Sequence, residues 1–203
     1  MNRIALVCAA IIGLAGGIAV SLVNSQPKLT ALESGTLLEP PREIASFTLT
    51  NETARFDNES LIGQWQLVFF GFTRCPDICP TTLQLLVDAR NDLSATFDRS
   101  QLPEIILVSV DPQHDTPSRL ADYTEFFDPS VRGVVGSEDE LARFSKNLGV
   151  LYQRIPLEDG DYTMDHTGAV IAINPQGEWA AVFSPPLRRS ALVSDLELLL
   201  GET

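Results

Sequence analysis

Basic residues are scarce in this chain. Lysine and arginine together number 14 among 203 residues, against 27 aspartates and glutamates, so the formal net charge is −13. A nucleic-acid-binding surface needs lysine and arginine to neutralise phosphates, and the composition therefore argues against nucleic acid as a partner. A charge of this sign suits a basic protein partner or a cation, and it also keeps a protein soluble.

Cysteine and histidine are equally sparse, with three and two residues. Cys8 lies in an apolar N-terminal segment, where a small apolar side chain is its simplest role. Cys75 and Cys79 are the only cysteines of the remaining sequence, and His114 and His166 are its only histidines. Thiol or soft-metal chemistry in the globular part must therefore use Cys75 and Cys79.

The N-terminal segment is the one long hydrophobic run. Ile4–Val23 carries no charged residue, and a helix over it would span about 30 Å, the thickness of a bilayer core. We expect residues 1–25 to form a membrane anchor, with a cleaved signal peptide as the alternative. A large domain that follows such a span is normally translocated. We therefore expect a single span of the inner membrane, with the domain on the periplasmic or equivalent extracytoplasmic side.

Residues 26–42 contain Pro27, Pro40 and Pro41 and show no hydrophobic periodicity. This composition predicts a tether between the anchor and the folded part of the chain. The folded domain is then expected to begin near Glu43 and to cover residues 43–203.

The rest of the sequence alternates apolar strands with amphipathic helices. Continuous apolar runs at 66–73 and 104–110 predict strands that are buried on both faces. Helical periodicity and capping residues predict helices over 80–97, 116–127 and 137–148. Shorter strands are expected at 47–49, 131–135, 151–155, 162–164, 169–173 and 179–183, and a closing helix at 189–200. This order implies an α/β fold with a mixed central sheet flanked by helices.

The two cysteines lie in Gly71–Pro80 (GFTRCPDICP), directly after the apolar stretch Leu67–Phe70. If the loop is helical there, a spacing of four places the two thiols on the same side, where they can form a disulfide or bind one metal ion. A structural staple is the less favoured interpretation, because so short a loop restrains little of the unfolded chain. A position near a helix N-terminus lowers thiol pKa values, which serves redox chemistry and metal binding alike.

A histidine would complete a metal site. His166 precedes the strand predicted at 169–173, and a loop entering a central strand could bring its imidazole to the thiols. Two thiolates and one imidazole suit Cu(I) and also hold Cu(II), whereas zinc usually takes a fourth ligand. By itself, a lone histidine is more often a loop residue than a ligand. His114 is expected to lie in a solvated turn between a strand and a helix.

Four segments together resemble the SCO/SenC family (synthesis of cytochrome c oxidase). Gly71–Pro80 resembles the family's cysteine signature, and Ser109–Pro117 (SVDPQHDTP) resembles its Ser-Val-Asp-Pro-x-x-Asp-Thr-Pro segment. Asp165-His166 before a strand and Asn174–Gly177 (NPQG) in a hairpin are similar to two further family segments. The resemblance covers about residues 43–200. Arg74 departs from it, because many members have histidine before the first cysteine.

The resemblance implies a thioredoxin-like fold, tethered to a membrane outside the cytoplasm, that binds one copper ion per chain, as Cu(I) or Cu(II). It implies that Cys75, Cys79 and His166 are the copper ligands. It further implies a metallochaperone that receives copper from an upstream donor and helps to assemble the binuclear copper site of cytochrome c oxidase, or of another cuproenzyme. Asp77 and Asp165 are candidates for supporting the ligands, and exposed loop acid is the simpler role for Asp77.

Two other functions fit the same residues. The chain is not expected to be an enzyme as a metallochaperone, but Cys75 and Cys79 could be the redox-active pair of a thiol–disulfide oxidoreductase that reduces the cysteines of the client's copper site. A copper or redox sensor that signals to a partner is the third hypothesis. His166 discriminates between the first two, because thiol exchange requires only the cysteines.

Overall fold

The computed structural model describes residues 31–158 and 160–201. Their main element is a six-stranded sheet with the order β1-β10-β9-β4-β5-β6. The sheet strands are β1 (Gly35–Glu43), β4 (Gln66–Gly71), β5 (Glu104–Ser109), β6 (Val131–Val134), β9 (Val170–Ile173) and β10 (Glu178–Phe183). The helices are α2 (Ile78–Leu93), α3 (Pro117–Glu125), α4 (Glu138–Asn147), α5 (Arg189–Gly201) and the short 3-10 helix η1 (Asn58–Leu61).

The centre of the sheet is parallel. Strand β4 pairs in parallel with β5, and β5 pairs in parallel with β6. Every side chain of β4 is buried, as are five of the six in β5, which confirms the two central strands expected from the apolar runs. Parallel neighbours require long crossovers, and α2 and α3 provide them.

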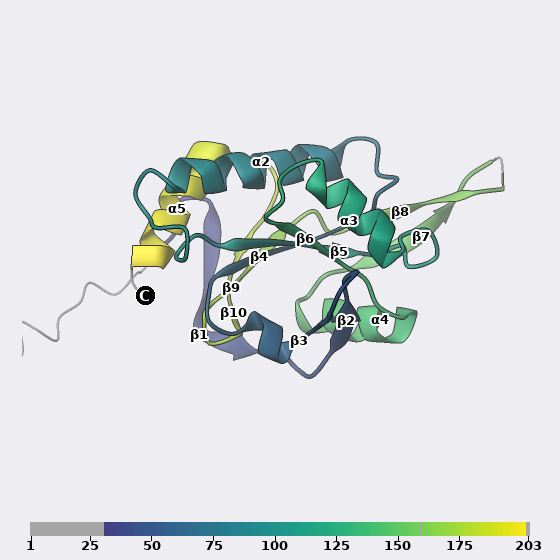
Figure 1. Ribbon diagram of the computed structural model, residues 1–203, viewed down its shortest axis with the longest axis horizontal. Helices are drawn as coiled ribbons and strands as arrows, with labels where there is room; N and C mark the ends of the chain where they lie inside the picture. The colour runs from purple at the N-terminus through teal and green to yellow at the C-terminus, as the bar shows by residue number, and fades with distance from the viewer. Residues whose placement is uncertain (1–30, 159, 202–203) are drawn as a thin grey trace, which may run out of the picture. The chain divides into compact units, whose positions relative to one another are not determined.

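The C-terminal part of the sheet is antiparallel. Strand β9 pairs with β4 and β10 pairs with β9, so the sheet is mixed as expected. The β9–β10 connection is the predicted turn at Asn174–Gly177, and Gly177 has φ 80°, which a side chain would disfavour. Figure 1 shows α2 and α5 on one face of the sheet, with α4 and the small sheet of β2 (Thr48–Thr50) and β3 (Arg55–Asp57) on the other.

Aromatic side chains fill the space between the sheet and α4. Phe70 of β4 and Phe47 both lie against Phe144 of α4, with ring centroids 5.8 and 4.0 Å apart. All three are fully buried. Burial of such rings is the main term that holds these layers together.

A second hairpin stands apart from the central sheet. Strands β7 (Tyr152–Pro156) and β8 (Tyr162–His166) pair only with each other among the described strands. Figure 1 shows this hairpin extending beyond the end of the central sheet. Four of the five β7 side chains are exposed, so the hairpin has little core of its own.

The tether expected at 26–42 is wrong for about its second half. Gly35–Glu43 forms β1, which pairs antiparallel with β10 at the edge of the central sheet. The strand was hard to predict because it is mostly exposed and carries Pro40 and Pro41, where its register with β10 shifts between Leu37 and Arg42. Proline is tolerated at such an edge because one side of the strand needs no ladder hydrogen bonds.

The membrane anchor expected over residues 1–25 lies outside the described residues. Within the described part of the chain, none of the helices has the length and apolar character needed to cross a bilayer.

Candidate metal centre

The thiol loop joins the end of β4 to the start of α2. Cys75 lies in the loop and is partly exposed, whereas Cys79 is the second residue of α2 and is fully buried. The helix was expected to begin at Pro80, but it begins at Ile78, because proline is compatible with the first turn of a helix. Gly71 allows the close approach of the helix, since a Cβ there would lie 3.0 Å from Cys79 Sγ.

The two thiols differ in protonation. The backbone N–H of Cys79 donates to Cys75 Sγ at 3.4 Å. Hydrogen bonds from the Cys79 thiol first, then with His166 and from the amides of Asp77 and Cys79, lower the pKa of Cys75 to about 4. The pKa of Cys79 is raised, because its proton is shared with Cys75 and because it is buried. Cys75 is therefore a thiolate at neutral pH. Cys79 keeps its proton until it binds a metal ion or is oxidised to a disulfide.

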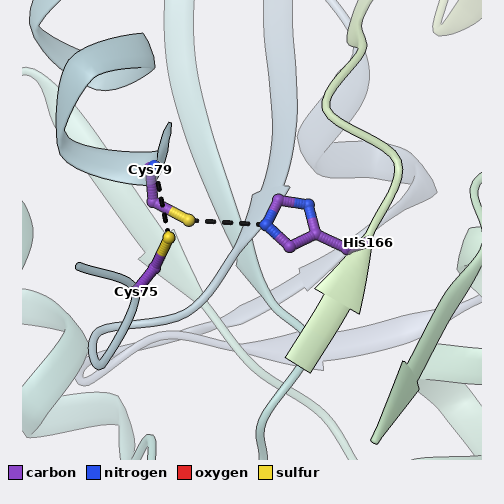
Figure 2. A group of neighbouring side chains, drawn as sticks. All are labelled: Cys75, Cys79 and His166. Atoms are coloured by element: carbon purple, nitrogen blue, oxygen red, sulfur yellow. Dashed lines mark hydrogen bonds between the residues drawn. The ribbon is translucent and has the colours of Figure 1, made fainter. Parts of the chain in front are cut away.

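His166 is the last residue of β8 and faces the thiols. Its Nε2 lies 3.5 Å from Cys79 Sγ, as Figure 2 shows. Its Nδ1 lies 3.2 Å from the carbonyl oxygen of Thr167, so Nε2 is the ring nitrogen that faces the sulfurs. Phe69 and Phe72 hold the ring by edge contacts, with ring centroids 5.8 and 6.1 Å from that of His166.

These three side chains could hold one metal ion. Their ligand atoms all lie within 4.8 Å of one another. A metal–thiolate bond of about 2.3 Å lets a single ion bridge donors separated by about 4.6 Å, so only small side-chain adjustments are needed. Two sulfurs and one nitrogen form a soft donor set, and the site fits copper better than a hard cation such as Mg²⁺. The structure thus brings together all three residues expected as ligands.

The Ser109–Pro117 segment holds the thiol loop in place through hydrogen bonds. Asp115 is buried and accepts hydrogen bonds from the backbone N–H of Thr73 at 3.0 Å, from its hydroxyl and from the hydroxyl of Ser109 at 2.7 Å. A buried carboxylate that is fully hydrogen-bonded fixes the chain around it. The segment was matched to the family by its sequence, but its role of holding the loop two residues before Cys75 became visible only in the fold.

His114 lies in the turn between β5 and α3, as the sequence suggested, and its side chain is 32% exposed, but it also joins a buried cluster. Its Nδ1 lies 3.0 Å from the buried carboxylate of Asp111 and 2.8 Å from the hydroxyl of Tyr162. That hydroxyl also donates to Asp111 at 2.6 Å. The cluster joins the loop after β5 to the start of β8. No sequence signal pointed to it, because Asp111, His114 and Tyr162 come from segments that meet only in the tertiary structure.

Asp77 and Asp165 are both exposed. Asp77 precedes α2 without a side-chain capping bond, and Asp165 accepts a hydrogen bond from Gln153 within the hairpin at 3.3 Å. The contact of Asp165 does not involve a ligand side chain, and Asp77 acts on Cys75 through its backbone N–H.

Comparison with known proteins agrees with this geometry. The family model described as SCO1/SenC matches residues 36–201. The chain belongs to the SCO1/SenC family. Among its relatives is a Stutzerimonas stutzeri protein named as a candidate copper-binding protein, 34% identical over 172 residues, with 83% of each chain covered.

Other family members show how far the likeness extends. The human mitochondrial protein SCO1 homolog is 32% identical over 154 residues; the alignment covers 74% of this chain and 50% of that protein. The chain thus spans about half the length of this mitochondrial relative. The crystal structure of Arabidopsis thaliana ScoI with copper bound superposes with a TM-score of 0.74 at 26% identity, covering 79% of this chain and all of the other. The fold is therefore the thioredoxin-like α/β fold of the SCO proteins.

Proposed function

We propose that this SCO1/SenC protein is a copper metallochaperone that binds one copper ion through Cys75, Cys79 and His166. The observation that carries the proposal is the convergence of two sulfurs and one imidazole nitrogen within 4.8 Å, from two separate segments of the chain. Relatives named for copper, including a SCO structure with copper bound, support the choice of metal.

Membership of the SCO1/SenC family supports a proposal for the protein that receives the copper. We propose that the protein accepts copper from an upstream donor and delivers it to the copper-receiving subunit of cytochrome c oxidase, or of another cuproenzyme. Residues 1–25 would anchor it to the membrane, with the domain on the extracytoplasmic side. The segment between the anchor and β1 would be the tether, shortened from the sequence-based estimate because β1 belongs to the sheet.

Each ligand has a distinct part in copper capture and release. Cys75 is ionised before copper arrives, and it is the more exposed sulfur, so it makes the first contact with an incoming or outgoing ion. Cys79 releases its proton when it binds copper, so loading releases at least one proton per ion. His166 comes from the peripheral hairpin and is the ligand that a client's donor atom can displace with least disturbance of the core.

A thiol–disulfide oxidoreductase is the second candidate. The specific observation in its favour is a partly exposed thiolate hydrogen-bonded to a buried thiol. This arrangement suits attack by Cys75 on a client disulfide, followed by resolution of the mixed disulfide by Cys79. Copper transfer and thiol exchange both require reduced cysteines, so a single chain could perform both.

Copper titration of the reduced protein tests the metal site. We expect one copper ion per chain and a thiolate-to-copper charge-transfer band on adding Cu(II). The band and tight binding should disappear in Cys75→Ser and in Cys79→Ser, and both should survive in Cys8→Ser. Undiminished binding in both serine variants would place the ligands elsewhere and overturn the proposal.

His166→Ala separates the two functions. Cu(I) tolerates two thiolates alone, so the variant should lose Cu(II) affinity more strongly than Cu(I) affinity, while its cysteines still form a disulfide. In cells the chaperone hypothesis expects His166→Ala to leave the copper client immature. Normal maturation with His166→Ala, together with failure of Cys75→Ser, would instead identify thiol exchange as the essential activity.

A further inference from the structure

Backbone pairing with the central sheet does not set the position of His166, whose ring contacts that sheet through Phe69. Strands β7 and β8 form a two-stranded sheet of their own, and a hairpin of two strands is at most marginally stable without further contacts. His166 nevertheless lies within 3.5 Å of a thiol carried by α2. Some contact outside the hairpin ladder must therefore hold β8 against the thiol loop.

Arg74 makes such a contact. Arg74 directly precedes Cys75 in the chain, and its guanidinium reaches Asp161 and Tyr162 at the start of β8. Nη1 donates to Asp161 Oδ2 at 2.7 Å, and Nη2 donates to the carbonyl oxygen of Tyr162 at 3.1 Å. The guanidinium also lies over the Tyr162 ring, 5.1 Å from its centroid.

Arg74 and Tyr162 also share a partner in the interior, the buried Asp111. Arg74 Nη2 lies 3.5 Å from Asp111 Oδ2, and the hydroxyl of Tyr162 donates to Asp111 Oδ1 at 2.6 Å. The Asp111 side chain has no exposed surface, whereas that of Asp161 is 48% exposed. The exposed ion pair alone contributes little, because water and salt screen it. The buried end, where Arg74 and Tyr162 share one desolvated carboxylate, gives the contact its rigidity.

We propose that Arg74 is a positioning residue for the copper site, which ties the β7–β8 hairpin to the thiol loop through Asp161, Tyr162 and Asp111 and so holds His166 in reach of Cys79. The expected effect on copper binding rests on the proposed copper function, whereas the contact between Arg74 and the hairpin does not. Arg74 contacts no ligand atom of His166. Its effect on copper passes through the hairpin.

The proposal makes a specific distinction between copper oxidation states. If the hairpin loosens, the imidazole is lost from the site more often while both thiolates remain. Cu(II) binding should then weaken, because it depends on the nitrogen ligand, and Cu(I) binding should change little. Substituting residues that orient a metal ligand typically costs about tenfold or more in affinity.

The decisive variant is Arg74→Gln, measured alone and combined with His166→Ala. We expect Arg74→Gln to weaken Cu(II) binding about tenfold in competition with a chelator, with Cu(I) affinity within about threefold of wild type. In the His166→Ala background the same substitution should change Cu(II) affinity no further. An unchanged Cu(II) affinity in Arg74→Gln, or an equal loss in the absence of His166, would overturn the proposal.

Asp111→Asn distinguishes positioning from a direct effect of the Arg74 charge on the thiolates. It removes the buried charge that Arg74 and Tyr162 share and leaves the positive charge beside Cys75. Positioning predicts that Asp111→Asn weakens Cu(II) binding as Arg74→Gln does, and wild-type binding would contradict it. Arg188→Gln is the matched control, because Arg188 pairs with Glu33 at the exposed surface in a similar ion pair and should leave both affinities unchanged.

A copper-free measurement keeps this test separate from that of the proposed function. In metal-free protein, Arg74→Gln should raise amide hydrogen exchange in β7 and β8 about tenfold, with β4 and β5 unaffected. Unchanged exchange in the hairpin would refute the contact whatever copper does. If wild type binds no copper at all while exchange responds as expected, the proposed function fails and the positioning contact stands.

Discussion

Strands β4 and β9 bury every side chain, whereas β7 exposes four of its five residues and β8 buries none completely. The two regions nevertheless build one site. The central sheet and α2 fix Cys75 and Cys79, and the hairpin supplies His166. The two thiols thus follow a densely packed strand, whereas His166 is held at the edge of the core by Phe69 and Phe72 and by the polar contacts of its hairpin.

The difference predicts distinct roles for the two regions if the protein handles copper as we propose. Closely packed elements are rigid because any displacement opens voids, so the thiol pair would hold the ion in a fixed position. A hairpin with few buried contacts opens at lower free energy than the sheet does. The imidazole of His166 would then leave first while copper stays bound to sulfur, as the proposed transfer to a client requires.

The largest expected effect tests where the rigid region begins. A protein truncated to start at Glu43 should be far less stable than one that starts at Ala31. Besides most of β1, the shorter chain lacks Ser34 and Gly35, whose backbone N–H groups donate to the buried carboxylate of Asp195. Loss of the partners of a buried charge costs about 3–5 kcal/mol, before the lost strand is counted.

Thermal unfolding of the two truncated proteins measures this effect. Equal midpoints would show that β1 is dispensable and would restore the boundary near Glu43 that the sequence suggested.

Two substitutions that shorten apolar side chains test the contrast between the central sheet and the hairpin directly. Phe70→Ala removes a fully buried ring from β4 and should cost about 3–5 kcal/mol. Leu151→Ala, at the start of the hairpin, removes a side chain that is 78% exposed and should change stability by no more than about 0.5 kcal/mol. Chemical denaturation of both variants checks the comparison, and a large loss for Leu151→Ala would show that the hairpin has a core that the described contacts do not reveal.

The smallest expected effect concerns the pKa of Cys75, which is set on the rigid side of the site. Its thiolate persists above pH 4 and is lost only as the pH falls through about 4. Alkylation of Cys75 in metal-free, reduced protein should therefore be nearly constant between pH 7 and pH 5. A thiol with the usual pKa of about 8.5 would slow about 100-fold over that range.

Mass spectrometry of the alkylated peptides gives the rate for each cysteine. His166→Ala should raise the pKa of Cys75 but leave it below that of an ordinary thiol, because the hydrogen bond from the Cys79 thiol is the largest cause of the shift and remains in the variant. Urea-unfolded protein is the control with an ordinary thiol. A tenfold fall per pH unit in the folded wild type would contradict the low pKa.

Local signals in the sequence predicted most of the central architecture. The apolar runs marked β4 and β5, and Ser137 accepts the expected hydrogen bond from the N–H of Glu140 at the start of α4. Strand β1 was missed because an exposed, proline-containing edge strand has no apolar periodicity. Its place in the sheet depends on pairing with β10, which is distant in the sequence.

The sequence by itself determined the chemistry available to this protein, since a chain with one thiol pair outside its N-terminal segment and two histidines has few ways to bind a soft metal. It also determined the family, through motifs that keep their order along the chain. The family resemblance already indicated His166 as the histidine that meets the thiols, and only the tertiary structure decided what holds it there. His166 and the Arg74–Asp111–Tyr162 contact join segments that are far apart in the chain, and such contacts depend on packing and buried charge that local sequence patterns do not encode.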